Sequence, residues 1–322
     1  MSAPTVAVIG TGRMGPGIAV AFAVGGCPVL LIGRGQAQLQ LGEASFRAAL
    51  AALVEHGLLP AQAAQIASSR LQPTRELAHL GQAEVVVEAT PEVLGDKQAL
   101  FADLERLALP NAILASNTSG LPITQIVART RTAHRVVGMK FVNPAHLIPL
   151  VEVVKGEATT EEILVRACEI LKHIGKRPVA VRRDVPGFLN NRIQQAMRRE
   201  AISLVARGIA SAEDVDAVVR WGFGFRLLGV GTLETMDLVG LEQILKIHEY
   251  ILPDLDDSHE PSPLLRELVA RGETGARTGR GFFDWDPTRE QTARAHMENL
   301  LIEGLKLMQR LEGASIVSQE EL

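Results

Sequence analysis

A glycine-rich turn near the N-terminus constrains the fold more than any other part of the chain. Gly10-Thr-Gly-Arg-Met-Gly15 matches G-x-G-x-x-G, directly after an apolar strand-like run and at the start of a helix-like segment. Gly10 would permit a tight turn, Gly12 the close approach of a pyrophosphate, and Gly15 close packing of the helix on the strand. With Arg13 and Met14 between them, these residues are the predicted phosphate-binding part of a cofactor site. A turn without ligand is the alternative, but the context favours dinucleotide binding.

The residues after this turn continue to alternate strand-like and helix-like patterns. Strand-like runs occur at 5–10, 28–33, 84–89, 112–116, 135–142, 148–154 and 177–182, and helical periodicity occurs at 36–57, 94–108 and 160–174. This alternation predicts an α/β fold with a Rossmann-type, mainly parallel sheet. From Phe188 onward the pattern is almost wholly helical. We therefore expect a dinucleotide-binding domain over 1–184 and an all-α domain for substrate binding and dimerisation over 185–322.

The composition narrows the class of protein. The net charge is -4, charged residues make up 22% and hydrophobic residues 47%, with no clustered charge that would favour nucleic acid or a membrane surface. Two cysteines, Cys27 and Cys168, are too few for a disulfide framework and indicate free thiols in a reducing compartment. These features predict a cytoplasmic protein with a small-molecule substrate and no resident metal.

The second strand-like run bears on the choice of cofactor. NAD-selecting folds place Asp or Glu at its end to hold the ribose 2′-hydroxyl, whereas this chain has Gly33 followed by Arg34. Loss of the carboxylate removes repulsion against a 2′-phosphate, and a guanidinium adds a bidentate partner for it. The sequence thus favours NADP(H), with NAD(H) possible if Arg34 points to solvent or stacks on the adenine.

Several linked motifs then resemble the L-3-hydroxyacyl-CoA dehydrogenase family, and the resemblance covers nearly the whole chain. It implies a Rossmann-type domain, a helical domain that forms a homodimer, and an active site in the cleft between the two. The motifs are Glu88-Ala89-Thr-Pro-Glu92, Ser116-Asn117-Thr118-Ser119, Val142-Asn143-Pro144, Pro186-Gly187-Phe188, Gly231-Thr-Leu-Glu234 and Thr278-Gly-Arg-Gly281.

The family's catalytic serine, histidine, glutamate and asparagine match four positions here. The serine matches Ser119, the glutamate Glu152 and the asparagine Asn191, whereas the histidine position, 21 residues after Ser119, holds Lys140. The resemblance implies that Ser119 and Asn191 also contact the substrate. Taken singly, Ser119 and Asn191 could be helix caps, and Glu152 could be half of a structural ion pair.

Three further residues are predicted to bind the cofactor: Glu92, Lys97 and Asn117. For Glu92 and Lys97, pairing with each other at the surface is nearly as good an interpretation.

Lys140 is the one departure among the catalytic positions, and it changes the expected chemistry. Lysine titrates near 10.4 in water, so a lysine beside Glu152 should be charged, able to donate a proton in reduction and poorly able to accept one in oxidation. Lys140 is therefore predicted first as a general acid/base in an enzyme biased towards reduction. It could instead serve amine chemistry, with ammonia attacking a carbonyl, or mark a weakened dehydrogenase that acts as a binding protein.

The resemblance implies a substrate that is a 3-oxo or 3-hydroxy acid or a related ketone, and it leaves open whether this is a free acid or a coenzyme A thioester. Family members that bind coenzyme A have a lysine-rich helical arm, but residues 36–69 contain one arginine, Arg47, besides His56. Gly224-Phe-Arg226 resembles the branch of L-gulonate 3-dehydrogenase, carnitine dehydrogenase and lambda-crystallin, which suggests that Arg226 binds a substrate carboxylate. The segment TGRGFFDW, residues 278–285, resembles the acyl-CoA branch instead.

Overall fold

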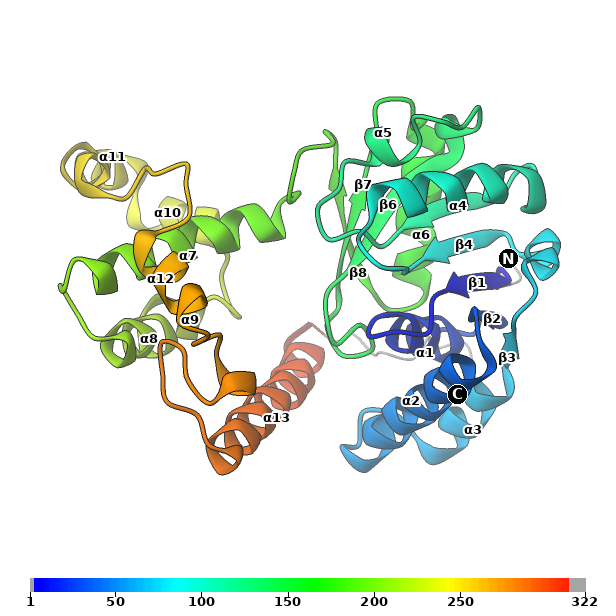
Figure 1. Cartoon of the computed structure of the whole chain (residues 1–322), viewed down its shortest axis with the longest axis horizontal. Helices are drawn as coiled ribbons and strands as arrows, with labels where there is room; N and C mark the ends of the chain where they lie inside the picture. The colour runs from blue at the N-terminus through cyan, green and yellow to red at the C-terminus, as the bar shows by residue number, and fades with distance from the viewer. Residues whose placement is uncertain (1–2, 313–322) are drawn as a thin grey trace. The chain divides into compact units, whose positions relative to one another are not determined.

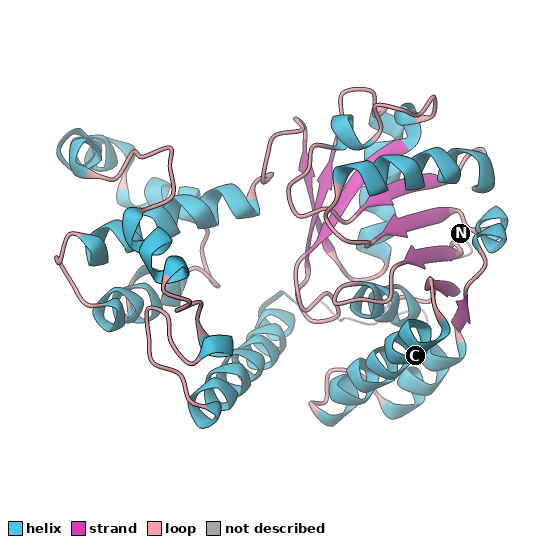
Figure 2. Ribbon diagram, viewed as in Figure 1, coloured by secondary structure: helices cyan, strands magenta, loops and turns pink. Residues whose placement is uncertain are grey.

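The computed structural model describes residues 3–312, and these divide into two compact units. Unit 1 comprises the described residues up to Arg192 and from Leu305 onward, and unit 2 comprises Ile193–Gly304. Figure 2 shows that the strands, drawn in magenta, belong to unit 1, whereas unit 2 consists of helices and loops. The predicted fold class, a mainly parallel sheet followed by a helical part, is confirmed.

Unit 1 is built on an eight-stranded sheet with the order β3-β2-β1-β4-β5-β6-β7-β8. Every neighbouring pair is parallel except β6 and β7, which run antiparallel. Because the chain order reverses between β1 and β4, the carboxyl ends of these strands border the crevice in which such sheets bind ligands. The strands are β1 (Val6–Ile9), β2 (Val29–Ile32), β3 (Leu71–Thr74), β4 (Val85–Glu88), β5 (Ile113–Ser116), β6 (Val136–Phe141), β7 (Leu150–Val154) and β8 (Arg177–Val181).

Helices cover both faces of this sheet (Figure 1), as the apolar strands require. On one face Phe22 of α1 meets Phe141 of β6, with ring centroids 6.0 Å apart. On the other face Phe101 and Leu104 of α4 and Ile123 of α5 join one buried apolar cluster. Burial of each such side chain contributes about 1.5–3 kcal/mol. The helices are α1 (Gly15–Val24), α2 (Gln36–Glu55), α3 (Ala61–Ser69), α4 (Leu94–Leu107), α5 (Ile123–Ile126) and α6 (Glu161–His173), with 3₁₀ turns η1 (Leu77–Gln82) and η2 (Ala133–Arg135).

Unit 2 contains a series of shorter helices. Ser211 caps the first of them, α8, by accepting a hydrogen bond from the backbone N–H of Asp214 at 3.1 Å. The helices are α8 (Ala212–Trp221), α9 (Phe223–Arg226), α10 (Thr232–Val239), α11 (Leu241–Ile251) and α12 (Pro263–Ala270), with 3₁₀ turns η3 (Leu252–Asp254) and η4 (Ala276–Thr278). Two longer helices, α7 (Asn190–Ala206) and α13 (Pro287–Glu312), belong partly to each unit. Over residues 3–312, no helix is long and apolar enough to cross a membrane.

The seven predicted strands are all present, but one further strand has no signal in the sequence. β3 has the sequence Leu-Gln-Pro-Thr, which lacks an apolar or alternating pattern and contains Pro73. It pairs only with β2 at the edge of the sheet, where a proline is tolerated. The functional division of the chain at residue 184 stays a prediction, because compact units describe contacts and not roles.

Candidate active site and cofactor cradle

The glycine-rich turn has the geometry that a nicotinamide dinucleotide requires. Gly10 has φ +116°, and a Cβ there would lie 2.5 Å from the carbonyl oxygen of Ala89. A Cβ on Gly15 would lie 1.8 Å from the carbonyl oxygen of Gly10, so α1 can pack this closely on β1 only with glycine. Gly12 is exposed, and a Cβ there would meet nothing within 4 Å. The two packing glycines shape the turn, and the third leaves room for phosphates.

The first turn of α1 lies directly behind this cradle. Met14 is the N-cap residue, and its side chain makes no capping hydrogen bond to the helix. The free backbone N–H groups of a helix start favour an anion. Gly12 and the exposed Arg13 also line a cavity of about 300 Å³ together with residues 143–146. The cradle therefore fits a dinucleotide, and the residues that bind it stay a prediction.

The residues after β2 bear on the ribose of such a cofactor. Gly33 is buried, and a Cβ on it would lie 3.0 Å from Cγ2 of Thr11 and 3.3 Å from Cδ1 of Leu39. Arg34 follows it and is exposed. The two residues that directly follow β2 are thus a glycine and an exposed arginine, and neither is a carboxylate.

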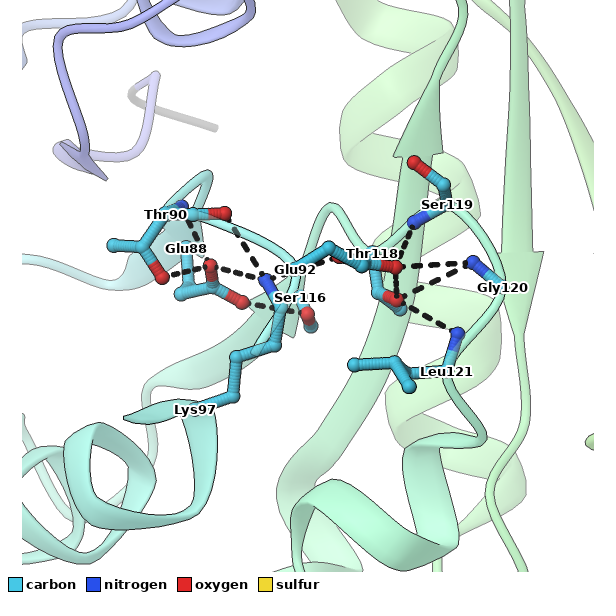
Figure 3. A network of polar contacts seen from close by, with 9 residues as sticks. All are labelled: Glu88, Thr90, Glu92, Lys97, Ser116, Thr118, Ser119, Gly120 and Leu121. Atoms are coloured by element: carbon cyan, nitrogen blue, oxygen red, sulfur yellow. Dashed lines mark hydrogen bonds and ion pairs between the residues drawn. The ribbon is translucent and has the colours of Figure 1, made fainter. Parts of the chain in front are cut away.

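A buried polar network lies at the carboxyl ends of β4 and β5 (Figure 3). Lys97 of α4 and Glu88 of β4 are both fully buried, and their Nζ and Oε1 atoms lie 2.6 Å apart. The hydroxyl of Ser116 donates to the second oxygen of Glu88 at 2.6 Å. Lys97 also lies 3.5 Å from Glu92, so its charge is balanced inside the protein. Whether Lys97 contacts the cofactor stays a prediction, because this ammonium is already paired.

Glu92 holds the turn that carries Ser119. One oxygen of its carboxylate accepts hydrogen bonds from the hydroxyl of Thr118 at 2.5 Å and from the backbone N–H of Ser119 at 2.8 Å. Figure 3 shows the Ser119 hydroxyl pointing away from this network. Since Ser119 is exposed, its hydroxyl is available to a substrate while its backbone is fixed. The sequence predicted Glu92 as a cofactor ligand and did not predict this supporting role.

Lys140 of β6 and Glu152 of β7 form a buried ion pair. They lie directly opposite each other in the antiparallel register of β6 and β7, and Nζ and Oε2 are 2.6 Å apart. Lys140 is 6% and Glu152 1% exposed. The second oxygen of Glu152 accepts from the backbone N–H groups of Leu189 at 2.7 Å and Asn190 at 2.9 Å, at the start of α7. Three hydrogen-bond donors thereby fix the position of the Glu152 side chain.

Phe188 completes the surroundings of Lys140 and was not singled out from the sequence. It is fully buried, adopts φ 54°, and its ring centroid lies 5.7 Å from Nζ of Lys140. A cation over an aromatic face is stabilised. The left-handed backbone of Gly187 (φ 77°) and Phe188 turns the chain so that Leu189 and Asn190 aim their N–H groups at Glu152. The motif Pro186-Gly187-Phe188 was the available signal.

Two asparagines connect segments of this site by hydrogen bonds. Oδ1 of Asn117 accepts from the backbone N–H of Phe141 at 2.8 Å, which joins the ends of β5 and β6. Nδ2 of Asn191 donates to the backbone carbonyl of Ser119 at 2.8 Å. The structure thus brings Ser119 and Asn191 together, and separately Lys140 and Glu152. Their catalytic roles stay predictions.

Arg226, predicted to bind a substrate carboxylate, is an exposed residue of α9 in unit 2. That role stays a prediction. Over the described residues, no cluster of three or more histidine, cysteine, aspartate or glutamate side chains could hold a metal ion.

Comparison with known proteins identifies the same architecture. The sequence model described as 3-hydroxyacyl-CoA dehydrogenase, NAD binding domain, matches residues 5–185, and that of the C-terminal domain matches residues 187–285. A probable 3-hydroxybutyryl-CoA dehydrogenase of Bacillus subtilis is 36% identical, over 89% of this chain and 99% of its own length.

A second relative carries a different kind of name. The 5-formyl-3-hydroxy-2-methylpyridine 4-carboxylate 5-dehydrogenase of Mesorhizobium japonicum is 31% identical, over 95% of this chain and 99% of its own length. A solved structure of a dehydrogenase for this pyridine carboxylate, described as an NAD+-dependent dismutase, has a TM-score of 0.88 at 31% identity and covers 97% of this chain and 99% of that one. The chain therefore belongs to the 3-hydroxyacyl-CoA dehydrogenase family, and it is a nicotinamide-dependent oxidoreductase that interconverts 3-hydroxy and 3-oxo acid derivatives.

Proposed function

We propose that this enzyme works as a reductase of a small, free oxo acid, with Lys140 as the proton donor. The observation that carries the proposal is the buried pair of Lys140 and Glu152, 2.6 Å apart, at the position where the family has a histidine. A histidine can accept or donate a proton near neutral pH, whereas a lysine paired with a carboxylate is suited to donation.

The reaction divides between the cofactor and this chain's own residues. A reduced nicotinamide, when bound beside Gly10, Gly12 and Gly15, would supply the hydride that converts the C=O bond of the substrate into a C–O single bond. Lys140 gives its proton to the carbonyl oxygen, so the product is an alcohol, and Lys140 regains a proton from solvent. Ser119 donates a hydrogen bond to the same oxygen, which stabilises the developing negative charge. Glu152 keeps Lys140 oriented throughout, because its other oxygen is fixed by α7.

The helical arm after β2 supports a substrate without coenzyme A. Arg47, the arginine of α2, lies 3.1 Å from Glu43, so its charge is already paired. A phosphorylated adenosine would find no free cationic cluster on α2 or α3. The Mesorhizobium relative, which covers 95% of this chain, and the solved structure with a TM-score of 0.88 are both named for a pyridine carboxylate, and that name contains no thioester.

The proposed function is tested by the products of the purified enzyme. We expect NADPH-dependent conversion of free 3-oxo acids and small aldehyde or keto carboxylates to alcohols, with kcat/KM at least about tenfold above that for acetoacetyl-CoA. The assay follows NADPH absorbance and identifies products by mass spectrometry, with and without ammonium. An amine product that requires ammonium would replace alcohol formation with amine chemistry. No turnover of any substrate would favour a binding protein.

We also propose NADP(H) as the preferred cofactor, with NAD(H) as the competing one, because Arg34 follows Gly33 where a carboxylate would select NAD(H). Replacing Arg34 with alanine should raise the KM for NADPH about tenfold or more and leave that for NADH within about twofold, because a bidentate guanidinium–phosphate contact contributes about 1.5–3 kcal/mol. Initial rates with both cofactors give the ratio. Arg47→Ala, at an exposed arginine of α2, is the matched control. Tighter use of NADH by the wild-type enzyme would contradict the preference.

The remaining proposals concern assembly and location. Unit 2 exposes many large apolar side chains, among them Trp221, Phe225, Leu233 and Leu238, which a partner surface would cover. We propose that residues 185–322 form the substrate and dimerisation domain of a homodimer in the cytoplasm. Light scattering should then give twice the 34.7 kDa of one chain.

A further inference from the structure

Lys176 is a buried lysine that the proposed reaction does not use. It follows α6 after Gly175, whose φ of 75° ends the helix, and its own backbone N–H donates to the carbonyl of Leu171 at 2.9 Å. The side chain is therefore directed by a fixed turn. It is 7% exposed and lines a small cavity against Val20 and Val24 of α1.

The ammonium of Lys176 donates hydrogen bonds to two backbone carbonyls. Nζ lies 2.7 Å from the carbonyl oxygen of Ala145 and 3.0 Å from that of Ile148. Burial lowers the pKa of Lys176 to about 7, and within residues 3–312 no carboxylate pairs with it to offset that cost. Burial of a lysine without a counter-charge costs free energy. Its two hydrogen bonds, to the carbonyls of Ala145 and Ile148, offset part of that cost and fix the segment that carries these carbonyls.

The segment that Lys176 holds joins the two catalytic strands. Residues 142–149 connect β6, which carries Lys140, to β7, which carries Glu152. Residues 143–146 of this connection also line the cavity beside Gly12 and Arg13 of the dinucleotide turn. A Cβ on Gly17 of α1 would lie 3.3 Å from Cβ of Ala145, so the connection packs tightly on the first turns of α1.

We infer that Lys176 is a positioning residue for dinucleotide binding: its ammonium fixes the β6–β7 connection as one wall of the cofactor cavity. Without these two hydrogen bonds the carbonyls of Ala145 and Ile148 lose their buried donor, and the wall loosens next to Gly17. The inference concerns the nicotinamide dinucleotide in general and does not depend on the NADPH preference or on the substrate.

The test is the replacement of Lys176 with methionine in the full chain, with binding read by titrating the fluorescence of NADPH and NADH. Both dissociation constants should rise about tenfold, since hydrogen bonds from a charged group are lost. Lys172→Met, at an exposed lysine of α6 one turn earlier, is the matched control and should leave both constants within about twofold. Unchanged binding by a folded Lys176→Met protein would overturn the inference.

The wild-type protein offers a second test that does not require the variant to fold. His146 is the other titratable group that lines the small cavity beside Val20 and Val24. Burial, followed by the charge of Lys176, lowers the pKa of His146 to about 4, so this side chain stays neutral near pH 7. Discharge of Lys176 should weaken its hydrogen bonds, so the dissociation constant of NADH should rise between pH 6 and 9 with a midpoint near 7. A constant that stays flat over this range would also overturn the inference.

The free energy of unfolding should increase as the pH rises, whereas the affinity for NADH should fall. Because the pKa of Lys176 falls from 10.5 to about 7 on folding, the unfolded chain binds more protons between these values. The free energy of unfolding of the wild type relative to Lys176→Met should therefore increase as the pH rises from 7 towards 10. A difference that does not change over this window would show that folding does not lower the pKa of Lys176.

Discussion

Replacing Lys140 with methionine should lower kcat for the reduction of a free oxo acid by about 10²- to 10⁴-fold, which is the usual contribution of a positioned acid or base. Methionine approximates the length and apolar stem of lysine and has no proton to give. Without Lys140 the substrate oxygen would have to take its proton from water. The dissociation constant of NADPH should stay within about threefold, because the cradle at Gly10–Gly15 follows β1, which β4 and β5 separate from β6 in the sheet. Steady-state kinetics and a cofactor titration measure the two effects.

A matched control separates this effect from loss of any lysine near β7. Lys155 follows β7 and pairs with Glu161 at 3.1 Å, but this pair is much more exposed to solvent than the pair of Lys140 and Glu152. Lys155→Met should keep kcat within about twofold. If Lys140→Met also kept the wild-type rate with the same substrate, Lys140 would not be the proton donor.

Replacing Glu152 with glutamine should destabilise unit 1 by about 3–5 kcal/mol, because the Lys140 ammonium would remain buried without its counter-charge. Glutamine can still accept from the backbone N–H groups of Leu189 and Asn190 through its amide oxygen. The loss of stability in Glu152→Gln therefore measures the removed charge of Glu152 more than a change in side-chain shape. Urea unfolding of both proteins gives the difference in the free energy of unfolding.

Two further variants make this prediction specific. The double variant Lys140→Met with Glu152→Gln removes both charges and should recover part of the loss, which gives a coupling free energy from the double-mutant cycle. Glu161→Gln breaks the exposed pair with Lys155 and should cost at most about 1 kcal/mol. Equal losses for Glu152→Gln and Glu161→Gln would mean that the buried pair has no special role in stability.

Much of the site could be predicted from the sequence because its residues sit on strands whose order is regular. The glycine turn, the Gly33–Arg34 pair and the twelve-residue spacing of Lys140 and Glu152 all depend on the local chain or on adjacent strands. The structure places Lys140 directly opposite Glu152, as a pairing of the two strands requires. Spacing can reveal such a pair because an antiparallel register fixes which residues face each other.

Other features could not be predicted because they depend on contacts between distant segments. Glu88 is the last residue of an apolar strand, and only the packing of α4 shows that Lys97 is its partner. Glu92 was predicted as a cofactor ligand, but its contacts with the Ser119 turn arise from two separate loops. Lys176 lies in the turn after α6 among other basic residues, and nothing local singles it out because its two carbonyl partners belong to another connection. Strand β3 has no strand-like sequence at all and forms through its pairing with β2.

Lys140 is the proton donor of the proposed reduction, and the pH dependence of alcohol oxidation by the wild type and by Lys140→His tests this role most directly. Histidine titrates near 6.5 and lysine near 10.4 in water, so the residue that must accept the proton in oxidation differs in basicity by several pH units. We predict that oxidation by Lys140→His becomes faster than that by the wild type at neutral pH and stops rising at a lower pH. Identical pH profiles for the two enzymes would contradict the assignment of Lys140 as the proton-transfer residue.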